Sequence, residues 1–372
     1  IALVQKIIQE AIEKRASDIH IENYGEYAKL RYRIDGYLYE QKELSIKDLP
    51  AIISRIKIMS DLNIAEKRLP QDGRIQLKLK DRQIDIRVSV QPTVVGENVV
   101  LRILDKESIL IGLENLGLDE LKMVIVDRAI RRPYGMVLVT GPTGSGKTTT
   151  LYSILNRISS PSLNIMTIED PVEYRLELIR QTQVNPVAGY TFANGLRALL
   201  RQDPDVIMVG EIRDRETADI AVRAALTGHL VLSTLHTNDA AGAFVRLIDM
   251  GVEPFLVASS IHCIIAQRLV RLVCDKCKRK AEPEPQVLES LGLKEGQHTF
   301  WHGKGCRLCN GTGYQGRTGI FEVLTTSRRI KEAVMKRSSG EQIREIARSE
   351  GMETLREDGI KKAIQGKTTI EE

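Results

Sequence analysis

The order of hydrophobic and polar positions divides the chain into two parts with different patterns. In the first part, short stretches alternate between apolar and polar residues, as strands with one buried face do. Leu30-Arg31-Tyr32-Arg33-Ile34 is an example, and Asp35-Gly36 after it is a typical hairpin turn. Apolar residues at helical spacing predict helices over residues 3–12 and 49–59. This part therefore predicts a small α/β domain with a mostly antiparallel sheet.

Three further predictions concern the first part and the residues that follow it. Gln71-Asp72-Gly73 is predicted to be a second turn, because aspartate and glycine favour turn conformations. Arg87 and Arg102 lie in predicted strands, where arginine side chains ordinarily extend along a solvated face. Residues 106–116 are predicted to be a linker, so the first domain covers residues 1–105.

From about Gly117, apolar strands alternate with helices, which indicates a parallel sheet in a doubly wound domain. The predicted strands are Met136–Thr140, Leu163–Ile168, Val206–Gly210 and Leu230–Ser233. The predicted helices lie near residues 147–158, 192–202, 214–227, 239–250 and 254–268. Cys263 falls in the last of these helices and is predicted to be a core residue. From Arg329 onward, apolar residues at helical spacing predict a helical C-terminal part.

The candidate phosphate loop is Gly141-Pro142-Thr143-Gly144-Ser145-Gly146-Lys147-Thr148, followed by Thr149. It has the G-x-x-x-x-G-K-[ST] spacing and lies between a predicted strand and a predicted helix. Glycines let backbone N–H groups point at phosphate oxygens, and the helix N-terminus adds its positive dipole end. Lys147 can reach the β- and γ-phosphates, and the Thr148 hydroxyl can bind Mg²⁺. A chance glycine turn would rarely have the preceding strand as well, so we predict a nucleotide site.

Polar residues follow three other predicted strands. Glu169 ends one of them, Glu211 follows the next, and His236 comes just after the third. Ligands of open parallel sheets bind beyond the carboxyl ends of the strands, where phosphoryl transfer needs such groups. Each residue alone is explained as well by a solvated loop position or a structural histidine. As a set beside a phosphate loop, they predict catalytic residues.

Arg197 and Arg201 are four residues apart in the predicted helix 192–202, so they share one face. They can reach phosphate, or they can pair with Asp203 or Asp205. The pattern leaves both interpretations open.

Four cysteines form two C-x-x-C pairs, Cys274 with Cys277 and Cys306 with Cys309. Such pairs are the usual arrangement for a tetrahedral structural zinc site. The alternative, a redox pair, lacks its usual βαβ setting. The long interval between the pairs predicts a looped excursion over residues 281–302, and the basic run 268–280 is predicted to be a solvated rim.

Length and charge limit the classes of protein that fit. The chain has 372 residues, enough for two or three domains, and 54 basic against 49 acidic residues. This balance does not indicate nucleic-acid binding. No uncharged apolar run reaches the ~18 residues of a membrane helix, so we expect a protein that is cytosolic or docks on a membrane from the cytosol. The first residue is Ile1 rather than Met, which is compatible with a fragment of a longer protein.

Together these motifs resemble the secretion ATPases that drive type II secretion and type IV pilus assembly. The resemblance covers nearly the whole chain. It rests on Arg31–Gly36, the phosphate loop, Thr167–Glu173, Val209–Asp214, Ser233–Asn238 and the two C-x-x-C pairs. It implies a PAS-like first domain (1–105), a RecA-like ATPase domain (117–270), a tetracysteine zinc-binding element (271–318) and a helical C-terminal subdomain (319–372).

The resemblance also assigns roles. It implies that Lys147 and Thr148 hold the phosphates and Mg²⁺ of ATP. It implies that Glu169 orients the attacking water, Glu211 supports the metal shell and His236 senses the γ-phosphate. Many P-loop enzymes have aspartate at the position of Glu211, whereas glutamate is normal for this family.

Four arginines match the phosphate-facing arginines of the family: Arg87, Arg102, Arg197 and Arg201. For the first two, this replaces the interpretation as solvated strand residues. Arginines of a mobile first domain would couple domain closure to the charge of the transition state.

The family also implies partners and a location. It implies a homohexameric ring that works in the cytoplasm, peripherally associated with the inner membrane through a platform protein and an adaptor. The tetracysteine element favours an assembly or secretion motor over a pilus-retraction motor. Residues 195–205 and 246–251 favour type II secretion. The alternatives are a DNA-uptake or DNA-translocating motor, and a scaffold that binds nucleotide without turnover.

Overall fold

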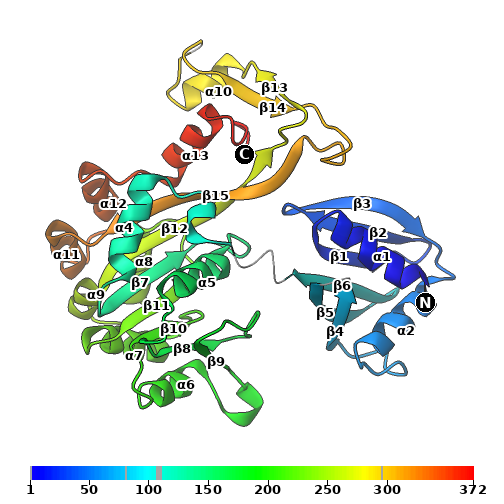
Figure 1. The fold of residues 1–372 in the computed structure, drawn as a ribbon, viewed down its shortest axis with the longest axis horizontal. Helices are drawn as coiled ribbons and strands as arrows, with labels where there is room; N and C mark the ends of the chain where they lie inside the picture. Colours follow the sequence, from blue (N-terminus) through cyan, green and yellow to red (C-terminus); the bar gives the residue numbers. More distant parts are fainter. Residues whose placement is uncertain (1, 80–81, 106–110, 295) are drawn as a thin grey trace. The chain divides into compact units, whose positions relative to one another are not determined.

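In the computed structural model, the chain divides into two compact units, residues 1–109 and 110–372 (Figure 1). The structure describes residues 2–79, 82–105, 111–294 and 296–372. Residues 106–110 of the predicted linker 106–116 therefore lie outside the described residues. Its last residues do not: Leu113–Asn115 form a short 3-10 helix (η1) that packs on α5 (Lys147–Ile158) of the second unit.

The first unit is a six-stranded antiparallel sheet with two helices, as the alternating pattern predicts. The strands lie in the order β3-β2-β1-β6-β5-β4. Their bounds are β1 Ala16–Asn23, β2 Ala28–Ile34, β3 Tyr37–Leu44, β4 Gln71–Leu79, β5 Arg82–Thr93 and β6 Gly96–Asp105. Helices α1 (Ala2–Glu13) and α2 (Leu49–Met59) bury the apolar residues of one sheet face. The Tyr32 hydroxyl, inside this core, donates to the carbonyl of Ile7 in α1 at 2.8 Å.

The turn predicted at Gln71-Asp72-Gly73 is wrong, because these residues begin strand β4. Gly73 is required there for a close approach rather than for a turn. A Cβ at this position would lie 2.5 Å from the backbone oxygen of Ser60, just after α2. The glycine therefore allows β4 to pass against the end of α2.

The second unit is built on a seven-stranded sheet in the order β15-β12-β7-β11-β10-β8-β9. All neighbouring strands are parallel except β12 and β15, which pair antiparallel. The bounds are β7 Gly135–Thr140, β8 Ile165–Glu169, β9 Ile179–Gln183, β10 Val206–Val209, β11 Leu230–Leu235, β12 Ile261–Val273 and β15 Tyr314–Thr325. The doubly wound α/β fold expected from the sequence is thus confirmed.

Helices cover this sheet and extend beyond it. They are α4 Glu120–Ile130, α5 Lys147–Ile158, α6 Phe192–Leu199, α7 Arg215–Leu226, α8 Ala241–Asp249, α9 Pro254–Ser260, α11 Arg328–Met335, α12 Gly340–Ser349 and α13 Leu355–Ile364; Pro186–Ala188 form the 3-10 helix η2. Helices α6 to α9 share one hydrophobic cluster with Met136 and Leu138 of β7. Because side chains alternate along a strand, Val137 and Val139 face the opposite side. Among the described helices, none is long and apolar enough to cross a membrane.

The helix predicted over 254–268 is half wrong. Only Pro254–Ser260 are helical, and strand β12 begins at Ile261. Residues from Cys263 to Gln267 are all buried, so this stretch shows no alternation, and a continuous apolar run is compatible with either a helix or a strand. Cys263 is fully buried as predicted, but in the sheet.

The predicted bounds of the two C-terminal elements also need correction. Strands β12 and β15 pair from Cys263↔Thr325 to Val273↔Tyr314, so the element predicted over 271–318 begins and ends inside these strands. Residues 319–325, predicted as part of a helical subdomain, belong to β15, and the helices begin at Arg328. The excursion between the cysteine pairs contains two short paired strands, β13 (Lys278–Ala281) and β14 (Phe300–Gly303), and helix α10 (Pro285–Ser290).

A buried ion pair of the first unit gives a testable prediction. The Lys57 ammonium of α2 lies 2.6 Å from the Glu97 carboxylate of β6, and the two side chains are 1% and 9% exposed. Lys57→Met leaves the buried carboxylate unpaired, and we expect it to lower the free energy of unfolding by about 3–5 kcal/mol. Urea unfolding followed by circular dichroism measures this change.

The matched control is Lys29→Met, which removes a pair of the same unit with Glu40 whose side chains are 27% and 48% exposed. We expect this variant to lose less than about 1 kcal/mol. Equal losses for the two variants would contradict the role of burial.

Candidate nucleotide and metal sites

The phosphate loop connects β7 to α5, as the sequence predicts. Gly146 is the residue before α5 and has φ of +87°, a conformation that L side chains rarely adopt. Gly144 also has positive φ, and a Cβ there would meet no atom within 4 Å, so the loop is open on this side. Thr148 is exposed in the first turn of α5, where its hydroxyl is available to a metal ion. The loop therefore has the shape and the helix N-terminus that a phosphate chain requires.

Lys147 is the charged group of this loop. It is 9% exposed, and its ammonium donates to the carbonyls of Gly141 and Pro142 at 2.8 and 2.9 Å. Burial lowers the pKa of Lys147, and the negative charge of Glu211 opposes this shift. Within the described chain, the buried hydroxyl oxygen of Ser145 has no hydrogen-bond partner. A buried cation and an unpartnered donor in one loop fit an anionic ligand such as the phosphates of ATP.

Gln267 of β12 supports the loop from the neighbouring strand. Its amide nitrogen donates to the Ser145 carbonyl at 2.8 Å, and its amide oxygen accepts from the Thr150 hydroxyl at 2.6 Å. Gln267 is 2% exposed, so both bonds are buried. No local sequence pattern indicates this residue, because it lies more than 100 positions along the chain from both partners.

Glu169, the last residue of β8, is 3% exposed and surrounded by donors. Its carboxylate accepts from Thr167 at 2.6 Å and from Gln181 of β9 at 3.1 Å. The Tyr152 hydroxyl of α5 donates to its second oxygen. Tyr152 is fully buried and also accepts from the Glu173 N–H at 3.3 Å. Sequence analysis missed these supporting residues, since only the fold brings α5 and β9 to the end of β8.

The environment of Glu169 sets its acidity. Burial raises the pKa of Glu169, while the hydrogen bonds from Thr167, Tyr152 and Gln181 act in the opposite direction. A carboxylate with a raised pKa is a better proton acceptor than an ordinary one. Such perturbed groups gather at functional sites, and this one lies on the sheet edge that carries the phosphate loop.

Glu211 and His236 come together at the ends of β10 and β11. The His236 Nε2 lies 3.5 Å from one carboxylate oxygen of Glu211, and the guanidinium of Arg213 lies 2.5 Å from the other. The Glu211 side chain is 14% exposed, whereas His236 is 50% exposed. The structure therefore brings these two predicted residues into one group on the edge where Lys147 lies.

The predicted arginines of α6 have other partners. Arg197 pairs with Glu216 of α7 at 2.7 Å, rather than with Asp203 or Asp205. Arg201 lies just beyond the end of α6 and donates to the Arg197 carbonyl at 3.0 Å. Both are on an exposed surface of the second unit.

Arg87 and Arg102 belong to the first unit, where they are opposite each other in β5 and β6. The Arg102 Nε donates to the Asp18 carboxylate of β1 at 2.9 Å, and its side chain is 63% exposed. Arg74 of β4 is the register partner of Arg87 on the other side. A row of arginines thus crosses the sheet on the face opposite the core, as the alternation of Arg87 with Ile86 and Val88 predicts.

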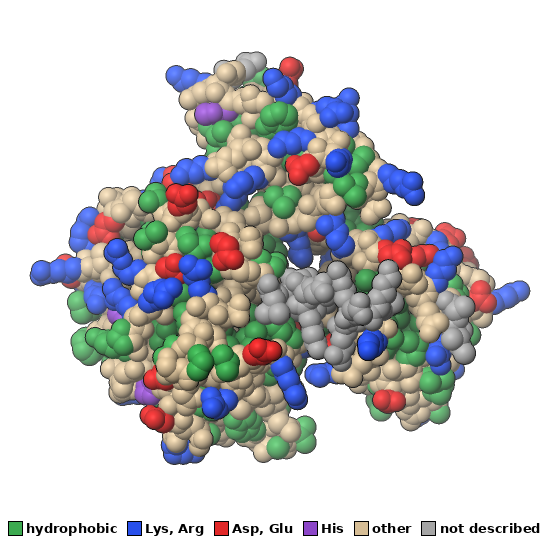
Figure 2. All heavy atoms as spheres, viewed as in Figure 1, with side chains coloured by type: hydrophobic (Ala, Val, Ile, Leu, Met, Phe, Trp, Pro, Cys, Tyr) green, Lys and Arg blue, Asp and Glu red, His purple; other side chains and the backbone are tan. Residues whose placement is uncertain are grey.

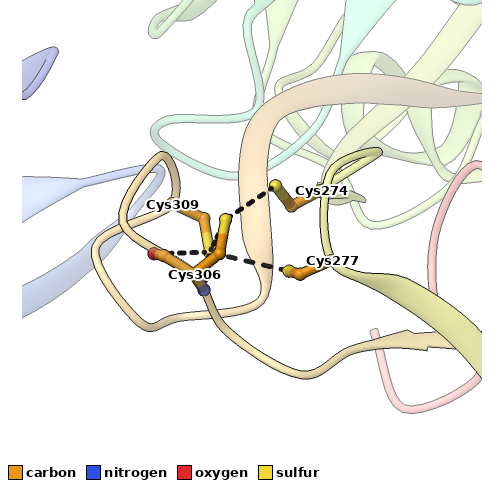
Figure 3. A group of neighbouring side chains, drawn as sticks. All are labelled: Cys274, Cys277, Cys306 and Cys309. Atoms are coloured by element: carbon orange, nitrogen blue, oxygen red, sulfur yellow. Dashed lines mark hydrogen bonds between the residues drawn. The ribbon is translucent and has the colours of Figure 1, made fainter.

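The four cysteines form one cluster, as the two C-x-x-C pairs predict (Figure 3). The sulfur of Cys274 lies 3.8 Å from that of Cys306, Cys277 lies 3.8 Å from Cys309, and Cys306 lies 3.7 Å from Cys309. Four sulfurs bound tetrahedrally to zinc at about 2.3 Å stand about 3.8 Å apart. The observed separations therefore fit a tetrahedral thiolate site.

Backbone donors complete this cluster. The N–H groups of Cys306 and Gly313 point at the Cys309 sulfur, at 3.1 and 3.3 Å. Such bonds favour the thiolate form that binds metal. The prediction that the basic run 268–280 forms a solvated rim is confirmed only in part. Arg268, Lys276, Arg279 and Lys280 are exposed, whereas Arg271 and Lys278 are partly buried. Figure 2 shows lysine and arginine side chains around this element (top of the view).

Comparisons with known proteins identify the family of the chain. The whole chain, residues 1–372, matches the family described as Type II/IV secretion system protein. It is 52% identical to the type IV pilus assembly ATPase PilB of Thermus thermophilus, over 99% of the chain and 42% of that protein. It is 50% identical to the type II secretion system protein E of Pseudomonas aeruginosa, over 100% of the chain and 74% of that protein.

Solved structures share the fold. The pilus retraction motor PilT with bound ADP is 28% identical and superposes with a TM-score of 0.65, over 98% of this chain and 94% of that one. The ATPase DotB of Legionella pneumophila is 22% identical, with a TM-score of 0.73 over 99% of this chain and 93% of that one. On the match to the family and these identities, the chain belongs to the Type II/IV secretion system protein family.

Proposed function

We propose that this chain is an ATP-hydrolysing motor that powers the assembly of a pilus or of the pseudopilus of type II secretion. The observation that carries the proposal is the meeting of Glu211 and His236 on the sheet edge that holds the phosphate loop. A site that only binds nucleotide needs the loop, whereas hydrolysis also needs groups that act on water and on the γ-phosphate. The names of the relatives, an assembly ATPase and a secretion protein, support the same activity.

In this proposal each residue of the second unit has one task. The phosphate loop holds the phosphates through its backbone N–H groups and Lys147, and Thr148 holds Mg²⁺, which neutralises charge on the phosphate oxygens. Glu169 takes the proton of the attacking water, which its raised pKa favours. Glu211 supports the metal shell, and His236 responds to the γ-phosphate.

The arginines supply positive charge to the transition state. Arg87 and Arg102 come from the first unit, and Arg197 and Arg201 from the second. Their guanidinium groups are planar and carry several donors, which suits phosphate oxygens. Because the first two belong to a separate compact unit, closing that unit on the nucleotide would couple chemistry to movement.

The motor acts as a homohexameric ring on the cytoplasmic side of the inner membrane. It works against a membrane platform protein and an adaptor, and it does not bind nucleic acid. The match to pilus and secretion proteins supports these partners. The four cysteines hold one structural zinc ion, in agreement with their sulfur separations.

Substitution of Glu211 tests the activity. We expect Glu211→Gln to lower kcat for ATP by about 10²–10³, because the metal shell loses a charge in the transition state, while nucleotide binding persists. Lys147→Ala should lose binding. Phosphate-release assays measure the rate of hydrolysis, and titration with a fluorescent ATP analogue measures nucleotide binding.

The control variant is Glu253→Gln, at an exposed residue before α9. A Glu211→Gln variant with the wild-type rate would support the nucleotide-binding scaffold instead.

Removal of one hydroxyl tests the role of Glu169. Tyr152 donates to its carboxylate, so Tyr152→Phe removes a group that favours ionisation and raises the pKa of Glu169 further. Since the ionised form is the proton acceptor, activity should be lost as pH falls, and the variant should lose it at a pH higher by roughly one unit. The pH profile of kcat/KM measures the shift. An unchanged acidic limb would exclude Glu169 as the base.

Metal analysis tests the cysteine cluster. We expect about one zinc per chain, because one tetrahedral site takes four thiolates. Cys274→Ser with Cys277→Ser should lose the zinc and leave nucleotide binding intact. The matched control is Cys263→Ala, since Cys263 is a buried cysteine of β12 outside the cluster and should leave the zinc in place. Protein purified without zinc would contradict the assignment.

A further inference from the structure

Three side chains from the C-terminal third of the chain hold the loop that follows His236. We call residues 236–240, which connect β11 to α8, the sensor loop. The side-chain oxygen of Asn238 accepts from Arg268 of β12 at 3.3 Å. Asp239 forms an ion pair with Arg344 of α12. Three separate elements thus contact three consecutive loop residues, because Ala240 also has a partner in β15.

That partner is Glu322, whose carboxylate accepts from the Ala240 N–H at 2.8 Å. Glu322 is 2% exposed and lies between Phe321 and Val323, which are also buried. Burial raises the pKa of Glu322, so the position costs stability unless the carboxylate has partners. The buried Glu322 carboxylate has such a partner in the Ala240 N–H, and this hydrogen bond fixes the residue at which α8 begins.

Asp239 joins the loop to α8 and α12 at the same time. One carboxylate oxygen accepts from the Gly242 N–H in the first turn of α8 at 2.7 Å, and the other pairs with the Arg344 guanidinium. Helix α12 packs directly on α8. Helix α12 is therefore connected directly to the residue three positions after His236.

We propose that Arg344 and Glu322 are positioning residues for the sensor loop: Glu322 fixes its end at Ala240, and Arg344 couples the position of α12 to the γ-phosphate site. The inference rests on the proposed function, in which His236 responds to the γ-phosphate. Coupling between two sites is reciprocal, so ATP binding also restrains α12. The phosphate loop itself has other supports, chiefly Gln267, and does not depend on these contacts.

A double-mutant cycle on the full chain tests the coupling. We expect Arg344→Ala and Asp239→Ala each to lower kcat about 5- to 10-fold while KM stays within about twofold, because the loop is displaced and the phosphate cradle is not. The double variant should be no slower than the slower single one, as for residues that act through one contact. Arg344→Lys should recover part of the rate.

The matched control is Arg348→Ala. Arg348 lies one turn further along α12, pairs with Glu357 at 2.8 Å, and its side chain is 55% exposed. We expect this variant to keep the wild-type kcat. Equal rates for Arg344→Ala and Arg348→Ala, or strictly additive losses in the cycle, would overturn the proposal.

Hydrogen exchange gives a measurement that does not depend on turnover. We expect Arg344→Ala and Glu322→Leu, but not Arg348→Ala, to speed exchange at the Ala240 and Gly242 amides. A non-hydrolysable ATP analogue should slow exchange in α12 of the wild type. Unchanged exchange at both places would overturn the coupling. By contrast, a wild type that fails to hydrolyse ATP would refute the proposed function and leave the exchange result to decide on the loop contacts.

Discussion

The parallel arrangement of β7, β8, β10 and β11 is the constraint on which the second unit depends. Parallel strands end at the same edge of a sheet, so residues at the ends of four strands come together although up to about 100 positions separate them. Lys147, Glu169, Glu211 and His236 all follow from this geometry. The packing of the apolar strands and their helices fixes the relative positions of the strand ends. The geometry of the site therefore depends on the whole sheet.

A second consequence is that the supporting contacts are buried and come from distant parts of the chain. Tyr152 supports Glu169 from α5, and Gln267 supports the phosphate loop from β12. Buried hydrogen bonds of this kind are stronger than exposed ones and tolerate little displacement. They hold the phosphate loop and the Glu169 carboxylate in place before a ligand arrives, which is the form of preorganisation that catalysis requires.

The sequence was sufficient wherever a local pattern carries the information. The phosphate loop, the strand ends at Glu169 and Glu211 and the cysteine pairs were located because their spacing is itself the signal. Strand β12 cannot be predicted from the pattern, because a run buried on both faces has no period. The strand position of Gly73 cannot be predicted either, because the glycine is required by the close approach of the Ser60 backbone, which follows α2. The partners of Arg197 and Glu169 depend on long-range packing, which no local pattern encodes. The catalytic roles themselves stay predictions.

Strand β12 joins two sites that differ in chemistry. Gln267 in its middle props the phosphate loop, and Cys274 follows directly after its last residue, Val273. Cys274 lies seven positions beyond Gln267, about 23 Å along an extended chain at ~3.3 Å per residue. Along its length a strand is stiff, because tension acts on covalent bonds. A tensile load applied at the cysteine cluster would therefore be transmitted along β12 to the phosphate loop with little loss to bending.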